Sequence, residues 1–168
     1  MHKTIVKYLP ALAWLAMTAL DAGAAHADNA VKRGEYLVQV ISCGDCHTPG
    51  ALAGKPDMAK YLGGSAIGFE IPGLGIFYPS NLTPDPATGL GKWSQAEIVT
   101  ALRTGVRPDG RELAPIMPWR SFAGLTDADA NAIAAYLKSL PPVADAAPAM
   151  VGPTEKPTSP YMTVVMPN

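Results

Sequence analysis

The sequence predicts an all-α fold, with three to four helices and one long loop rich in glycine and proline. In three segments, apolar residues recur at spacings of three and four positions, which is typical of amphipathic helices. Two of these segments begin with a residue pattern that favours a helix N-terminus. Residues 48–90, between the first and second segments, have no helical rhythm. We therefore expect helices to frame an irregular centre.

Residues 1–27 have the features of a cleavable signal peptide. They combine a basic start, an apolar run over residues 8–20 and a small-x-small pattern at residues 25–27. An uncleaved membrane anchor is the alternative, but Pro10 interrupts the run, which is shorter than the ~20 residues that span a bilayer. We therefore expect export, cleavage after Ala27 and no membrane span in the mature chain.

The chain that remains has a length suited to a single domain. Loss of the leader removes His2 and His26, so that His47 is the only histidine left. The whole chain has a formal net charge of −1 at pH 7. A strongly basic nucleic-acid-binding protein is therefore not indicated.

The first predicted helix covers residues 29–42 and runs into the next motif, because its apolar residues recur at helical spacing. Gly34 lies in its interior, where glycine costs about 1 kcal/mol relative to alanine. Gly34 is either a tolerated surface residue or the point at which another helix approaches closely.

The most informative motif is Cys43-Gly44-Asp45-Cys46-His47. In an exported protein, CxxCH is typical of a c-type haem attachment site, with two thiols for thioether bonds and a histidine for the iron. A closed zinc site needs a fourth ligand, and the chain has no second CxxC, CxxH or HxxxH. A thioredoxin-type pair needs βαβ surroundings, and a plain disulfide gives no role to His47. The motif therefore predicts one covalently bound haem c.

The loop over residues 48–90 carries many large apolar side chains, too many for a solvated linker. A loop that folds onto a large hydrophobic cofactor would explain both its apolar residues and its glycines and prolines. Short extended pieces around Phe69 and over residues 76–78 are expected to pair briefly.

Two further helices follow the loop. The first opens with a capping box of Ser94 and Glu97 and ends near Gly105. The last opens with a second capping box, of Thr126 and Asp129, and ends before two prolines at 141–142.

Residues 143–168 form a tail rich in proline and alanine. The tail is either disordered or laid along the domain, and its apolar end favours packing. The predicted organisation is therefore a signal peptide (1–27), a domain (28–142) and this tail.

The order of these features resembles a class I cytochrome c. The features that carry the resemblance are, in chain order, a helix with Gly34 and Tyr36, the CxxCH motif, a helix opened by Trp93, Met117-Pro118 in a loop, and a final helix with Tyr136. Four shorter stretches resemble the haem domains of cytochrome subunits that serve periplasmic alcohol, aldehyde and sugar-acid dehydrogenases: residues 81–85, 88–93, 117–119 and 135–142.

The resemblance implies the class I cytochrome c fold around one haem, a periplasmic location and Met117 as an iron ligand. It also implies that the first and last helices cross at Gly34 and Tyr136. The ring N–H of His47 is expected to donate to a carbonyl at or just after Pro49.

The second axial ligand of the iron can also be narrowed from the residues themselves. With His47 as the only histidine, the soft candidates are Met58, Met117, Met150, Met162 and Met166. Met117 stands out because Pro115 and Pro118 stiffen its loop, and Met58 is its nearest competitor. A thioether ligand favours ferrous iron and raises the reduction potential.

Residues near Met117 have further candidate roles. Trp93 either donates a hydrogen bond to a haem propionate or serves as a packing residue. Four arginines give this region a positive charge, so they neutralise propionates, meet an acidic partner or lie solvated: Arg103, Arg107, Arg111 and Arg120.

The leading functional hypothesis is an electron carrier, not an enzyme, that passes single electrons from a dehydrogenase to an oxidase or another cytochrome. A haem enzyme with an open or labile sixth iron site is the alternative, but no second histidine is present as an acid or base. A haem-based sensor would require a fused output domain. Ligation by Met117 distinguishes the carrier from both.

Overall fold

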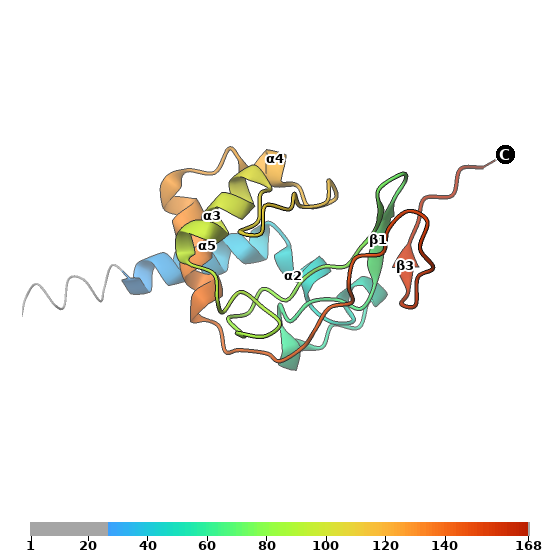
Figure 1. The fold of residues 1–168 in the computed structure, drawn as a ribbon. Coiled ribbons are helices and arrows are strands. Elements are labelled where there is room, and N and C mark those ends of the chain that lie inside the picture. The colour runs from blue at the N-terminus through green and yellow to red at the C-terminus, as the bar shows by residue number, and fades with distance from the viewer. Residues whose placement is uncertain (1–26, 168) are drawn as a thin grey trace, which may run out of the picture.

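The computed structural model describes residues 27–167, which form a group of helices beside a small sheet (Figure 1). The predicted signal peptide lies outside this part of the chain, apart from Ala27. Between residues 27 and 167, no helix has both the length and the apolar character needed to cross a bilayer. The elements are a helix over residues 27–40, α2 (Cys43–His47), the 3₁₀ turns η1 (Ala51–Ala53) and η2 (Met58–Lys60), β1 (Gly68–Ile71), β2 (Gly75–Phe77), α3 (Gln95–Thr104), α4 (Trp119–Phe122), α5 (Asp127–Ser139) and β3 (Tyr161–Met162).

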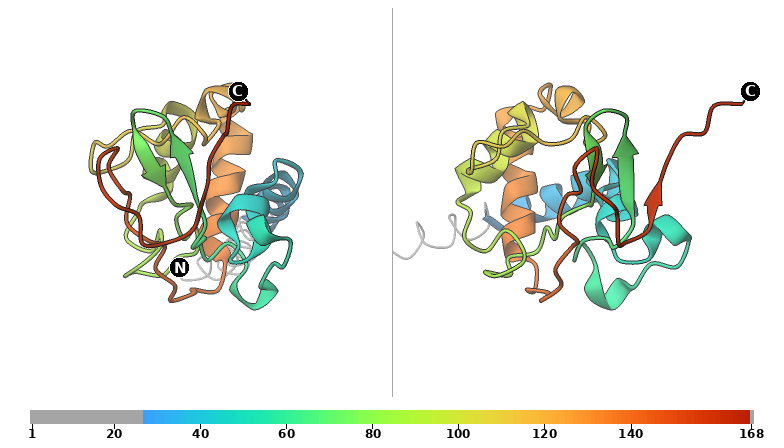
Figure 2. Two further views of the ribbon diagram at one scale, coloured as in Figure 1. Left: turned by 90° about the vertical axis from the view of Figure 1, so that its right-hand side faces the viewer. Right: turned by 45° about the vertical axis from the view of Figure 1, so that its right-hand side comes forward.

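Three helices build the helical half of the fold. The helix over residues 27–40 crosses α5, and α3 packs against α5 as well (Figures 1 and 2). At the crossing, a Cβ added to Gly34 would lie 2.7 Å from Tyr136 Cβ and would overlap the carbonyl group of Ala132. Only glycine fits this contact without displacing a helix. The expected crossing of Gly34 and Tyr136 is therefore confirmed.

The predicted capping box is confirmed at the start of α3, whereas only one of its two hydrogen bonds forms at the start of α5. The Ser94 hydroxyl accepts from the backbone N–H of Glu97, and the Glu97 carboxylate accepts from the backbone N–H of Ser94. At α5, Thr126 accepts from the backbone N–H of Asp129. The Asp129 carboxylate instead pairs with Arg33 at 2.8 Å. That ion pair links the first helix to α5.

One hydrophobic core joins the helices to the loop. Its buried members are Leu37, Val38, Leu62, Leu90, Ile98, Leu102, Ile133, Ala134, Tyr136 and Leu137. Leu62 and Leu90 belong to the segment over residues 48–90, so that segment packs inward. Cys43, Trp93 and Met117 pack against the same core. Three of the residues singled out from the sequence are thus anchored to one cluster.

The all-α prediction is wrong in part, because the loop and the tail form a small sheet. β1 and β2 pair antiparallel with Phe69 opposite Phe77, which confirms the brief pairing expected in the loop. β3, from the tail, pairs parallel with β1 and gives the order β2-β1-β3. Aromatic and β-branched residues favour these strands, and Gly73, with a φ of 78°, allows the turn between β1 and β2.

The middle of the C-terminal tail lies along the domain (Figure 2). The backbone of Val151 pairs with Ile76, and the carbonyl of Pro160 accepts from the backbone N–H of Gly68 at 3.0 Å. The apolar end beyond β3 is exposed, with Val164 at 82%. The tail is thus held by hydrogen bonds and not by burial of its last apolar side chains.

We expect Gly34→Ala to lower the free energy of unfolding by about 3 kcal/mol, because the new methyl group forces two helices apart. Urea unfolding measures this loss. Gly124→Ala is the matched control, since the nearest atom to its added Cβ is the Ser121 carbonyl oxygen at 3.4 Å. The control should change stability by less than about 1 kcal/mol. Equal stabilities of the two variants would contradict the close crossing.

Candidate haem site

The CxxCH segment forms a helical turn of its own. Ser42 adopts a left-handed conformation with a φ of 59°, so the preceding helix ends at residue 40 and α2 begins at Cys43. The prediction that one helix runs over residues 29–42 into the motif is therefore wrong at its end. Within α2, Cys43 and Cys46 are three residues apart and share one face of the helix. Both are free thiols.

His47 is buried and held by one hydrogen bond. Its Nδ1 lies 2.7 Å from the backbone carbonyl oxygen of Ser80. Because a carbonyl can only accept, Nδ1 carries the proton, and the Nε2 lone pair is left free for a metal. The expected acceptor at or just after Pro49 is wrong. The loop returns over α2 and brings in a carbonyl from 33 residues further along the chain.

Burial sets the charge of the side chains in the motif. Burial lowers the pKa of His47, and the bond to Ser80 opposes this shift. The neutral imidazole that ligates metals is therefore favoured. Burial also raises the pKa of Cys43 to about 11 and raises the pKa of Cys46, where Asp45 adds to the effect. Redox-active CxxC pairs need a lowered thiol pKa, so the thioredoxin-type alternative loses support.

The loop after α2 is tied to it through short hydrogen bonds. The Gly64 N–H donates to the carbonyl of His47 at 2.8 Å, and the Leu62 N–H donates to the Thr48 hydroxyl at 3.2 Å. Leu62 is fully buried and has a left-handed backbone, with a φ of 61°. Such a strained conformation persists only where the surroundings determine it. The loop therefore has a fixed position beside His47.

Met117 lies between α3 and α4 and is the sheltered methionine of the described chain. It is half-buried and packs against the core that also contacts Cys43. The other methionines between residues 27 and 167 are exposed: Met58 by 64%, Met150 by 48%, Met162 by 43% and Met166 by 78%. Exposure thus separates Met117 from its competitors.

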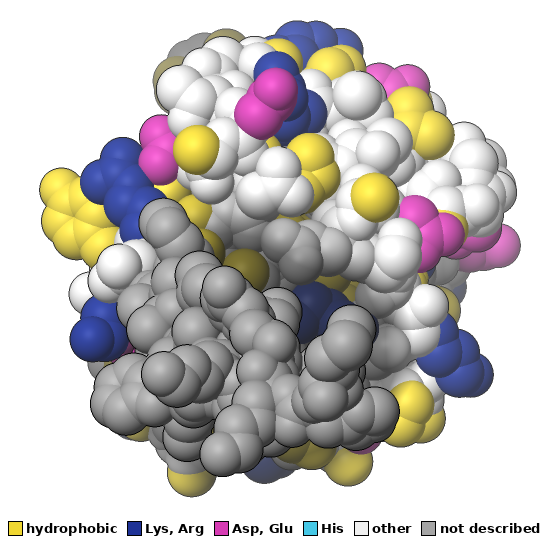
Figure 3. Space-filling model, turned by 90° about the vertical axis from the view of Figure 1, so that its left-hand side faces the viewer, with side chains coloured by type: hydrophobic (Ala, Val, Ile, Leu, Met, Phe, Trp, Pro, Cys, Tyr) yellow, Lys and Arg dark blue, Asp and Glu magenta, His cyan; other side chains and the backbone are white. Residues whose placement is uncertain are grey.

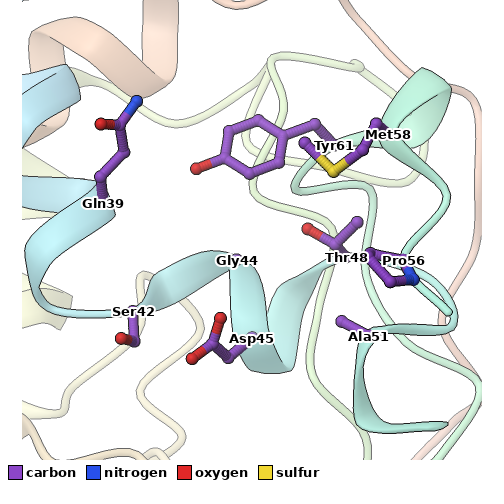
Figure 4. A pocket seen from close by; sticks show the side chains of 9 residues that line it. All are labelled: Gln39, Ser42, Gly44, Asp45, Thr48, Ala51, Pro56, Met58 and Tyr61. Carbon is purple, nitrogen blue, oxygen red and sulfur yellow. The ribbon is translucent and has the colours of Figure 1, made fainter. Parts of the chain in front are cut away.

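Met58, the nearest competitor in the sequence, lines an outer cleft of about 340 Å³ between the first helix, α2 and η2 (Figure 4). The lining residues are Gln39, Ser42, Gly44, Asp45, Thr48, Ala51, Pro56, Met58 and Tyr61. They include neither His47 nor the cysteines. This cleft therefore does not bring Met58 together with the motif's imidazole.

Trp93 and the predicted arginine cluster lie beside the loop of Met117. Trp93 is half-buried, and the guanidinium carbon of Arg107 lies 5.2 Å from its ring centre. Arg103 pairs with Asp127, and Arg107 lies 3.4 Å from an Asp109 oxygen. On the face shown in Figure 3, basic and acidic side chains of the described residues are interspersed. Of the four predicted arginines, Arg103 and Arg107 thus lie beside carboxylates, whereas Arg120 lies over the ring of Trp119.

Asn81, which opens the family-like stretch over residues 81–85 but had no predicted role, is the buried centre of the loop. It is 1% exposed. Its Oδ1 accepts from the backbone N–H of Thr83 at 2.8 Å and from the hydroxyl of the same residue at 2.7 Å. Its Nδ2 donates to Thr88 Oγ1 at 3.0 Å and to the carbonyl oxygens of Val143 at 2.7 Å and Asp145 at 3.1 Å.

This network controls the position of the His47 acceptor, because Asn81 directly follows Ser80. The Asn-x-Thr spacing, with the Asn81 side chain accepting from the backbone two residues on, is a recognised turn pattern. This turn pattern is the sequence signal from which a role of Asn81 could be predicted. The hydrogen bonds from Asn81 to residues 143 and 145 have no such signal in the sequence.

The residues present fit a covalently bound haem. Two free thiols on one helical turn match the two thioether bonds of haem c, and the free Nε2 of His47 matches an axial ligand. The core beside Cys43 and Met117 is apolar, as the macrocycle requires.

Together, the helices around α2 and this set of donors define a c-type haem protein. A family model for cytochrome c matches residues 31–141, which is more than half of the chain. The chain therefore belongs to the cytochrome c family, which implies the class I fold and haem c.

Several relatives are subunits of dehydrogenases. The chain is 40% identical over 135 residues to the cytochrome c subunit of a quinone alcohol dehydrogenase from Gluconobacter oxydans, covering 77% of this chain and 26% of the relative. It is 41% identical over 119 residues to one of the subunits of nicotinate dehydrogenase from Pseudomonas putida. The match covers 71% of this chain and 9% of the relative. It is 38% identical over 120 residues to the gluconate 2-dehydrogenase cytochrome c subunit from Pantoea cypripedii. This match covers 71% of this chain and 25% of the relative. The chain thus spans about a quarter or less of these relatives.

We expect Asn81→Ala to lower the free energy of unfolding by about 3 kcal/mol, because several buried polar groups lose their partner. Urea unfolding measures the change. The control is Asn131→Ala, which removes one exposed side-chain bond to the Asp127 carbonyl. Its cost should stay below about 1 kcal/mol. If both variants lose the same stability, Asn81 is not the centre of the loop.

Proposed function

We propose that this protein is a periplasmic one-electron carrier with a single haem c, held by Cys43 and Cys46 and ligated by His47 and Met117. The partial burial of Met117 carries the proposal, because the other methionines of the described chain are exposed. His47 is the sole histidine of residues 27–167, so a thioether is the remaining soft ligand. The two cysteines allow one CxxCH attachment site.

When bound, the haem supplies a ferric–ferrous couple for one-electron transfer, and the chain sets the conditions for it. The bond from His47 to Ser80 holds Nε2 in one orientation. Met117, between Pro115 and Pro118, would hold the iron through its thioether sulfur, which would leave no ligand site open to small molecules. Compared with a second imidazole, its thioether favours the reduced state. Electron transfer then requires no exchange of ligands.

We infer that the electrons come from a dehydrogenase and pass to an oxidase or another cytochrome. The relatives that carry alcohol, nicotinate and gluconate dehydrogenase names support a dehydrogenase as the donor. The absence of a second histidine in the described chain leaves no imidazole for acid–base chemistry. A carrier therefore accounts for the site better than a haem enzyme does.

We expect Met117→Ala to abolish the weak far-red absorption band of the ferric protein, which arises from charge transfer between sulfur and iron. The reduction potential should fall at the same time, because the thioether no longer favours ferrous iron. Met58→Ala is the control and should retain both properties. A wild-type protein that lacks the band and binds cyanide or carbon monoxide readily would favour the alternative, a haem enzyme or sensor with an open sixth site.

Export predicts a mature chain that begins at Asp28 and carries one haem. The intact mass of protein from a periplasmic fraction checks the cleavage site, and a pyridine haemochrome assay counts the haems. Cys43→Ser should keep the haem attached through Cys46 but shift its haemochrome band, because one thioether bond is lost. A mass that includes residues 1–27 would refute cleavage, and two haems per chain would refute the single site.

A further inference from the structure

We propose that the C-terminal tail positions the axial imidazole of His47 and thereby sets the reduction potential of the iron. This inference rests on the proposed function, because it requires a haem iron ligated by His47. The chain leaves α5 and passes along the loop before it reaches β3 (Figure 1). The residues that hold the haem in the proposed function all precede the tail, which begins at residue 143. The tail therefore acts through the loop that carries the acceptor of His47, the Ser80 carbonyl.

The tail meets the loop in a closed cycle of hydrogen bonds among Asn81, Thr83 and Val143. Asn81 Nδ2 donates to the Val143 carbonyl at 2.7 Å, and the Val143 N–H donates to the Thr83 hydroxyl at 3.1 Å. That hydroxyl donates to Asn81 Oδ1 at 2.7 Å, which closes the cycle. Asn81 and Thr83 are each 1% exposed, so water does not readily replace a lost partner. The first residue of the tail is therefore part of the buried network of the loop.

The tail also contacts the earlier part of the loop. Lys60 Nζ lies 2.9 Å from an Asp145 carboxylate oxygen. The side chain of Val143 packs on Gly63, where an added Cβ would lie 3.1 Å from Val143 Cγ1. The partly exposed ion pair contributes less than about 1 kcal/mol, so the buried cycle contributes most of the attachment.

A single rigid peptide unit connects Asn81 to the imidazole. The Ser80 carbonyl lies in one plane with the nitrogen and Cα of Asn81, because the peptide bond has partial double-bond character. This unit packs on Gly64, where an added Cβ would lie 3.1 Å from the Asn81 nitrogen and 3.2 Å from the Pro79 carbonyl oxygen. With Gly64 against its backbone and the tail bonded to its side chain, Asn81 fixes the direction of the Ser80 carbonyl. The oxygen of that carbonyl lies 2.7 Å from His47 Nδ1.

The hydrogen bond from His47 to Ser80 affects the iron, because a ring N–H that donates strongly makes the imidazole a more basic ligand. A more basic imidazole stabilises ferric iron more than ferrous iron, so it lowers the reduction potential. An attached tail keeps this hydrogen bond short, and a loosened tail lengthens it. The potential therefore rises when the cycle of hydrogen bonds to Val143 is broken.

Redox titration of the haem-loaded protein tests this inference with two matched pairs of variants. Thr83→Val removes the hydroxyl from the cycle and nearly keeps the side-chain shape, whereas Thr83→Ser keeps the hydroxyl. Val143→Pro removes the N–H donor of the tail, whereas Val143→Ala keeps it. We expect Thr83→Val and Val143→Pro to shift the ferric–ferrous equilibrium about threefold toward ferrous iron. This shift is a rise of about 30 mV, since a tenfold change is about 59 mV for one electron. The two conservative variants should keep the wild-type potential.

The ring N–H of His47 provides a readout that a purely structural role would not move. In NMR spectra of the ferrous protein, its Nδ1–H resonance should move upfield in Thr83→Val and Val143→Pro, because the hydrogen bond to Ser80 is longer. The far-red band of the ferric protein shows in each variant whether Met117 still ligates, and we expect it to persist.

An unchanged potential in Thr83→Val and Val143→Pro would overturn the inference, and so would an equal rise in Thr83→Ser and Val143→Ala. A higher potential with an unmoved Nδ1–H resonance, or with loss of the far-red band, would also overturn it, since the effect would not pass through His47. If Val143→Pro does not fold, the two Thr83 variants decide the outcome by themselves. A wild-type chain without covalent haem, or with an iron that His47 does not ligate, would instead refute the proposed function.

Discussion

The hydrogen bond from His47 Nδ1 to the Ser80 carbonyl is the contact on which the rest of the site depends. It sets the imidazole tautomer, leaves Nε2 free and holds the long loop across α2. The acceptor is a backbone group, so its position follows from the path of the chain and not from the side chain of Ser80. The architecture of the loop therefore determines how the imidazole is presented.

The loop has little regular secondary structure, so buried polar side chains hold its backbone in position. Backbone groups of an irregular loop need partners when they are buried. Asn81 and Asp85 supply them, and the Asp85 carboxylate accepts from the Thr88 hydroxyl and from the backbone N–H groups of Ala87 and Thr88. These bonds, led by that of the Thr88 hydroxyl, lower the pKa of Asp85. The loop is thus irregular in its backbone angles and still fixed in place.

The sequence was most informative where a feature depends on neighbouring residues. The Ser94–Glu97 capping box and the CxxCH turn both follow from local patterns. It was least informative where the partner is distant. The expected acceptor of His47 near Pro49 is wrong, and no local pattern predicts β3, because these pairings are set by tertiary packing. The half-formed capping box at α5 has the same cause, since Arg33 from another helix takes the Asp129 carboxylate.

The hydrogen bonds from Asn81 to Val143 and Asp145 join positions 62 and 64 residues apart. Contacts at such separation carry a large loop-closure entropy, so they form after local turns and helices. The covering loop cannot be completed until the chain beyond α5 has folded back onto it. The carbonyl of Ser80 that pairs with His47 therefore reaches its final position late in folding. Until then the imidazole lacks its acceptor, so the order in which the chain assembles leaves an interval in which the ring of His47 can still turn.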